Sequence, residues 1–142
     1  MAPGSKEAGA STTIDVSFMP KTDLPTNGVI KLICPAGFTL ESNPTAELYV
    51  KGSQVAANGG ISCAGSDRVL TCTRDGAGKV FQAGKDGVLL RVTQETAMKN
   101  PSSPAGTATG DFQIHTYDST EGAQLDDGTA PGYALDPSTV RC

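Results

Sequence analysis

The sequence predicts an all-β domain, specifically an immunoglobulin-like antiparallel β-sandwich of about seven to nine short strands. Two observations support this prediction. Stretches in which apolar and polar residues alternate run through nearly all of the 142-residue chain, and a period of two is typical of half-buried strands. Clusters of Gly, Pro, Asn and Asp separate these stretches, as turns separate the strands of a sandwich.

The first half of the chain supplies the clearest strands. Residues 12–18 alternate between apolar and polar faces, and an Asn-Gly turn at 27–28 begins the next strand. That strand, residues 28–34, places Ile30, Leu32 and Cys34 inward. Residues 47–51 place two aliphatic side chains on one face. Residues 61–63 and 68–73 are separated by Ala-Gly-Ser-Asp, which predicts a hairpin.

The second half continues the pattern less regularly. Residues 88–92 and 111–117 alternate, whereas the tail from Asp126 is rich in turn residues, with one edge strand expected near Tyr133–Leu135. Residues 94–99 are the only helical candidate, and so short a helix has little stability of its own. Residues 1–10 are small and polar and indicate a flexible linker or cloning scar, so the domain is expected to span residues 11–142.

Composition excludes several classes of function. The 11 basic residues are scattered singly in a chain of net charge −4, whereas nucleic acids and anionic membranes are bound by clustered Lys and Arg. No stretch approaches the roughly 20 apolar residues that span a bilayer. The first ten residues also lack the apolar core of a signal peptide, so an exported protein would carry its signal in a longer precursor. We expect no nucleic-acid partner and no membrane insertion.

Four cysteines, Cys34, Cys63, Cys72 and Cys142, indicate disulfides. Their spacing lacks the close cysteine pairs of zinc sites, and the chain has one His. Disulfides persist in oxidising compartments, so we expect an extracellular or cell-surface location. Four cysteines allow three connectivities. We favour Cys63–Cys72 across the hairpin together with Cys34–Cys142, and the alternative is that Cys142 pairs with another chain.

No catalytic constellation accompanies the strands. His115 is the only histidine. Ser119 and Asp118 are nearby in sequence, but neighbouring residues of a strand point to opposite faces, so a triad is not expected to converge. We therefore predict a protein that is not an enzyme and has no cofactor.

Two sets of residues are candidates for ligand binding. Tyr49 and Tyr117 fall on outward strand positions, where they could form a small glycan platform. Asp118, Asp126 and Asp127 lie where loops are expected, and loop carboxylates can bind Ca²⁺ through six to eight oxygens. A carbohydrate-binding module, calcium-assisted, is therefore the alternative function. Scattered surface tyrosines and solubilising acids are the simpler interpretation.

The order of strands and turns resembles a known class of module. The resemblance lies in residues 14–38, which end in Cys-Pro-Ala-Gly-Phe, and in residues 90–126, which contain Gly-Asp-Phe-Gln-Ile-His-Thr-Tyr-Asp. They resemble β-sandwich modules repeated along very large surface and cell-wall proteins of algae, oomycetes and related microbes. The resemblance covers residues 12–130 and implies a spacer, an adhesion element or a filament subunit. It brings no site residues with it.

The leading hypothesis is therefore a non-enzymatic extracellular structural or adhesive module, one repeat of a larger surface or filament protein. Its partners would be neighbouring modules or copies of itself. Unpaired N–H and C=O groups on edge strands offer a route for such assembly.

Overall fold

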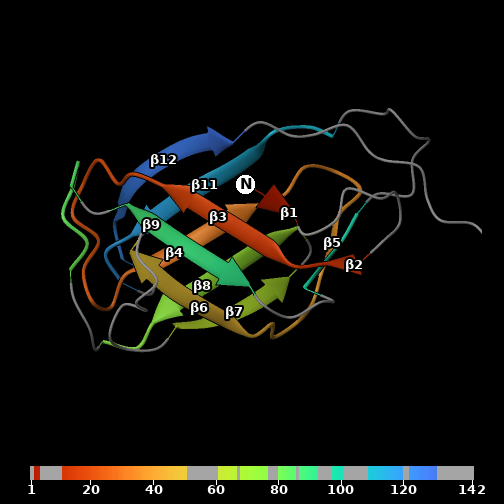
Figure 1. Cartoon of the computed structure of the whole chain (residues 1–142), viewed down its shortest axis with the longest axis horizontal. Helices are drawn as coiled ribbons and strands as arrows, with labels where there is room; N and C mark the ends of the chain where they lie inside the picture. Colours follow the sequence, from red (N-terminus) through yellow and green to blue (C-terminus); the bar gives the residue numbers. More distant parts are fainter. Residues whose placement is uncertain are drawn as a thin grey trace, which may run out of the picture.

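The alternating stretches form antiparallel strands, and the described residues contain no helix (Figure 1). The structure is a computed structural model that describes residues 2–3, 11–50, 61–66, 68–76, 80–85, 87–92, 97–100, 109–119 and 122–130. Eight of its strands are at least five residues long and four have two residues. The predicted immunoglobulin-like antiparallel sandwich is confirmed. No helix in the described part of the chain is long and apolar enough to cross a bilayer.

Two sheets form the sandwich, and a small third sheet lies at one end (Figure 1). The four-stranded sheet has the order β1 (Ala2–Pro3), β3 (Ile14–Phe18), β9 (Val88–Val92) and β6 (Ala46–Val50). The five-stranded sheet has the order β12 (Gln124–Ala130), β11 (Phe112–Tyr117), β4 (Val29–Ile33), β8 (Val69–Arg74) and β7 (Ile61–Ser66). The small sheet has the order β2 (Ser11–Thr12), β10 (Met98–Lys99) and β5 (Thr39–Leu40).

The core lies between the two larger sheets and is aliphatic with a few aromatic side chains. Alternate residues of β3, β9, β4, β8 and β11 point into it, as the period of two predicts. Phe112 is fully buried and packs edge-to-face on Phe38, with ring centroids 5.1 Å apart. The largest fully buried side chains are Phe81, Phe112, Ile14, Leu24, Ile30, Leu32, Leu70, Leu90, Met98, Val16, Val88 and Val92.

The predicted hairpin carries a disulfide. Strands β7 and β8 pair in a register that places Cys63 directly opposite Cys72, and these residues are bridged. Both are buried, so the bridge faces the core. The outer edge of β7 is also covered at one point, because the Gly65 N–H donates to the Ser42 carbonyl at 2.8 Å.

Three segments differ in secondary structure from the sequence-based expectation. β12 occupies part of the tail expected to be turns, because its backbone pairs with β11 over the whole of that strand. Within the helical candidate, Met98 and Lys99 form β10, and Met98 is buried between β2 and β5. Ala2 and Pro3 pair with β3 within the segment expected to be a linker or cloning scar. The edge strand expected near residues 133–135 lies outside the described residues.

A buried arginine closes one end of the sandwich. Arg74 is 3% exposed and donates to the Pro25 carbonyl at 2.9 Å. Its guanidinium also lies over the Phe81 ring, 5.1 Å from the centroid. Leu24 and Phe81 exchange two backbone hydrogen bonds beside it. This arrangement fixes the loop between β3 and β4.

Candidate functional site

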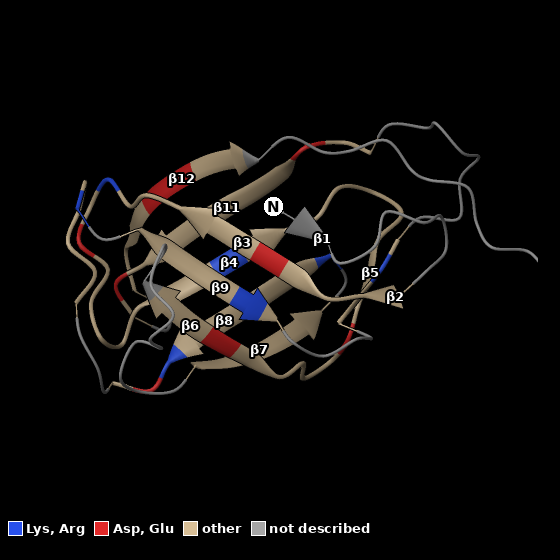
Figure 2. Ribbon diagram, in the orientation of Figure 1, with Lys and Arg blue, Asp and Glu red and all other residues tan. Residues whose placement is uncertain are grey.

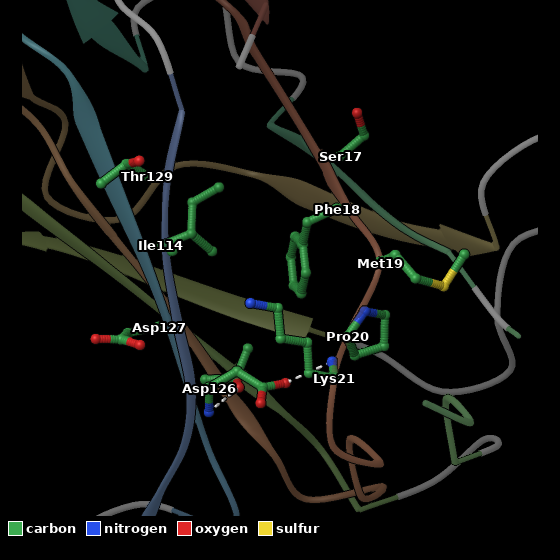
Figure 3. Close-up of a pocket in the computed structure, with 11 residues that line it drawn as sticks. Ser17, Phe18, Met19, Pro20, Lys21, Ile114, Asp126, Asp127 and Thr129 are labelled. Atoms are coloured by element: carbon green, nitrogen blue, oxygen red, sulfur yellow. Dashed lines mark hydrogen bonds between the residues drawn. The ribbon is translucent and has the colours of Figure 1, made fainter. Parts of the chain in front are cut away.

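The two long sides of the sandwich differ. On one side, β6 lies beside β7. On the other, β3 and the segment after it stand apart from β11 and β12, and a crevice of about 290 Å³ lies between them (Figure 3). This crevice is the candidate functional site. Its lining residues are Ser17, Phe18, Met19, Pro20, Lys21, Ile114, Thr116, Asp126, Asp127, Gly128 and Thr129.

The crevice has an apolar floor and a polar rim. Phe18 is partly buried against the core and Ile114 is 8% exposed, and both side chains point into the space between the strands (Figure 3). Met19 at the mouth is 50% exposed, the highest value for a large hydrophobic residue in the described part of the chain. Lys21 and Asp127 supply charges at the rim.

The backbone of β12 has a free edge at the crevice. β12 pairs with β11 on one side, and no other described strand pairs with it. β3 pairs with β9 along its whole length, but on its other edge β1 covers only Ile14 and Asp15. Unpaired strand edges of this kind can accept a further strand.

Asp126 ties the loop after β3 to β12. One carboxylate oxygen accepts hydrogen bonds from the backbone N–H groups of Lys21 and Thr22, both at 2.9 Å. The other oxygen accepts a hydrogen bond from the Thr22 hydroxyl at 3.0 Å. Figure 3 shows the bond between Asp126 and Lys21. The Asp126 N–H donates in turn to the hydroxyl of the buried Thr116 at 3.1 Å. These bonds join the two walls of the crevice at one end.

The acidic residues predicted to bind calcium are not brought together. Asp126 and Asp127 are adjacent in β12 and point to opposite faces of the sheet, because Asp126 pairs with the buried Thr116 and Asp127 with His115. Asp118 accepts a hydrogen bond from Ser119 at 3.3 Å. Within the described ranges, no three His, Cys, Asp or Glu residues are grouped as metal ligands would be. Calcium binding remains a prediction.

The tyrosines predicted as a glycan platform lie on opposite sheets. Tyr49 is in β6 and Tyr117 in β11, and each alternates with inward residues of its own strand. The Tyr49 hydroxyl donates to the Glu47 carboxylate, and this hydrogen bond raises the pKa of the phenol. Lys31 lies over the Tyr117 ring, 4.9 Å from its centroid. They cannot form one platform, and glycan binding remains a prediction.

The outer face of the four-stranded sheet carries a row of alternating charges. Asp15, Arg91 and Glu47 are cross-strand neighbours on β3, β9 and β6, visible as red, blue and red segments in Figure 2. Arg91 and Asp15 form an ion pair at 3.2 Å in which both side chains are substantially exposed. Such pairs contribute little to stability, and this face is well solvated.

His115 and Cys34 occupy positions without catalytic geometry. His115 faces outward from β11, with its Nε2 3.3 Å from the Gln113 side-chain oxygen. Cys34 is 1% exposed and has no disulfide partner among the described residues, and burial raises the pKa of its thiol to about 12 although Arg68 opposes the shift. Its predicted disulfide partner, Cys142, lies outside the described residues, and that bridge remains a prediction.

Two solved structures of bacterial pilins are similar in fold to this chain. The chain superposes on the major pilin subunit BcpA of Bacillus cereus with a TM-score of 0.51 and 14% identity, over 92% of this chain and 36% of that one. The C-terminal fragment of the major pilin GBS80 of Streptococcus agalactiae gives a TM-score of 0.45 and 9% identity, over 95% of this chain and 53% of that one. This chain thus spans only part of either protein.

No protein-family model matches the sequence, and a search of curated proteins gives no significant match. The likeness to BcpA supports an immunoglobulin-like sandwich fold. Both solved structures are of bacterial pilins, and the comparisons do not support the algal and oomycete origin that the sequence-based resemblance implied.

Proposed function

We propose that this chain is a non-enzymatic module of a larger extracellular surface or filament protein, in which it is a structural or adhesive unit. The observation that carries the proposal is the likeness of fold to BcpA, which extends over 92% of this chain but only 36% of the pilin subunit. That proportion suits one module of a multi-domain surface protein.

The Cys63–Cys72 bridge supports an extracellular location. Disulfides of this kind form in oxidising compartments and are rare where glutathione and thioredoxin keep thiols reduced. The two partners of the bridge lie in adjacent strands, so the bridge stiffens the sandwich itself. Copies of the same chain are the proposed partners.

Immunogold labelling of intact cells tests the proposed function. Antibodies raised against the purified domain should label the cell surface or filaments that extend from it, before any permeabilisation. Labelling that appears only after permeabilisation would contradict the proposal. An antibody against a cytoplasmic protein of the same cells is the control for integrity.

A further inference from the structure

We propose that the crevice between β3 and β12 binds the C-terminal segment of a second copy, with residues Tyr133–Leu135 added as a strand along the free edge of β12. This inference rests on the proposed function, since it specifies how copies would assemble.

The crevice presents apolar surface that the described chain leaves uncovered. Phe18 and Ile114 form its floor, and Met19 stands at its mouth with half its surface exposed. Val80 is the other exposed large hydrophobic residue among those described, and it does not line the crevice. Apolar side chains from an incoming segment would lose contact with water on entering this space.

The same crevice presents backbone groups that an incoming strand would satisfy. β12 is seven residues long, and no described strand pairs with its edge away from β11. An extended segment placed beside it would gain backbone hydrogen bonds while its alternate side chains point toward the crevice. Strand addition therefore uses both features at once.

The segment after β12 has the pattern that such an occupant needs. Twelve residues follow Ala130, and in extended form they would reach about 40 Å. Tyr133 and Leu135 are two positions apart, so in an extended segment they fall on one face. Their size and apolar character suit the crevice floor. Prolines at 131 and 137 flank this short run and limit its length.

A second copy is a better source of the segment than the same chain. To fold straight back onto β12, the tail would need a two-residue hairpin turn at Pro131–Gly132. The favoured turns of this length require positive φ at their first central residue, whereas proline is fixed near −65°. Pairing of β12 with β12 of another copy is also disfavoured, because about its centre the two Asp127 side chains would face each other.

The resulting contact is head-to-tail. The tail of one copy enters the crevice of the next, whose own tail remains available, so the contact can repeat into an open chain. A symmetric dimer would instead close after two copies. Growth of the parent chain beyond a dimer as its concentration rises therefore distinguishes a head-to-tail contact from a symmetric one.

The test uses full-length chains carrying Cys142→Ser, so that covalent linkage does not contribute. Self-association is measured by light scattering after size-exclusion chromatography over a wide concentration range. Met19→Asp blocks the crevice, Tyr133→Asp with Leu135→Asp blocks the tail, and Val80→Asp is the matched control at the other exposed hydrophobic position. Placing a charge in either half of the contact should weaken association about tenfold or more, because a buried unpaired charge is costly. The control should associate like the parent chain.

Mixing the two blocked variants gives the decisive result. Each retains one working half of a head-to-tail contact, so the mixture should form a one-to-one dimer that grows no further. Unchanged association of Met19→Asp would overturn the inference while leaving the proposed function standing, because surface labelling tests that function independently. A monomer at every concentration, destabilised by the tail substitutions, would also overturn it and show that the crevice holds the tail of its own chain.

Discussion

Replacing both Cys63 and Cys72 with alanine should lower the free energy of unfolding by about 2–3 kcal/mol. The bridge joins residues with a sequence separation of 9. For a loop of that size, the chain-entropy relation gives about 8.6 cal/mol/K, which is about 2.6 kcal/mol at 25 °C. Both residues are buried, so removal of the sulfur atoms also costs packing in the core.

Urea unfolding followed by circular dichroism measures this difference. The dependence of the free energy on urea should also steepen, because an unfolded chain without the bridge exposes more surface. Reductant should shift the midpoint of the wild-type chain toward that of the variant and leave the variant itself unchanged. A loss below about 1 kcal/mol would refute the loop-entropy argument, as would a wild-type midpoint that does not respond to reductant.

Three further predictions follow from single residues. Burial raises the pKa of the Cys34 thiol from 9.0 to about 12, so folding favours the neutral thiol. The free energy of unfolding should therefore fall as pH rises from about 9 to 12. A Cys34→Ala variant measured in parallel should lack this pH dependence. Gly65→Ala should destabilise by about 1–3 kcal/mol in urea titrations, since its new methyl group would meet the Glu41 carbonyl oxygen, whereas Gly128→Ala meets no atom within 4 Å and should be neutral. Asp126→Ala should lower the free energy of unfolding by about 1–2 kcal/mol, comparable to loss of a helix cap, and so lower the thermal midpoint. Asp126→Asn retains an acceptor for the two N–H groups and should lose less. Equal losses in both variants would contradict this role.

Strands that pack one face on the core could be predicted from the sequence. β3, β4, β9 and β11 point alternate residues into the core, although Val29 of β4 is also buried. The β7–β8 hairpin carries its turn residues and its two cysteines at matched positions. The short strands β2, β5 and β10 could not, because two residues give no period and their conformation follows from pairing with distant segments. β12 was missed because Asp126, Asp127 and Gly128 are typical of turns.

The crevice could be predicted only in fragments. Asp126 was selected as a possible calcium ligand, but its partners Lys21 and Thr22 are more than a hundred residues away in sequence. The alternation of residues 12–18 places Phe18 on the inward face, and nothing local indicates that the far end of β3 stands apart from β12. Arg74 resembles any charged residue at a strand end, and its burial depends on Phe81 and Pro25 from two other segments. Sites made by long-range contacts leave no local pattern.

The hydrogen bond at Gly65 limits how other molecules can pair with the edge of β7. A β-sheet with two unpaired edges can pair with further copies, because each added copy exposes another unpaired edge. Repeated pairing of this kind leads to amyloid-like aggregation. Here the Ser42 carbonyl already occupies the Gly65 N–H on β7. A foreign strand that met this edge would have to displace a segment of the same molecule. The five-stranded sheet therefore resists edge-to-edge pairing at β7, while its opposite edge at β12 stays accessible.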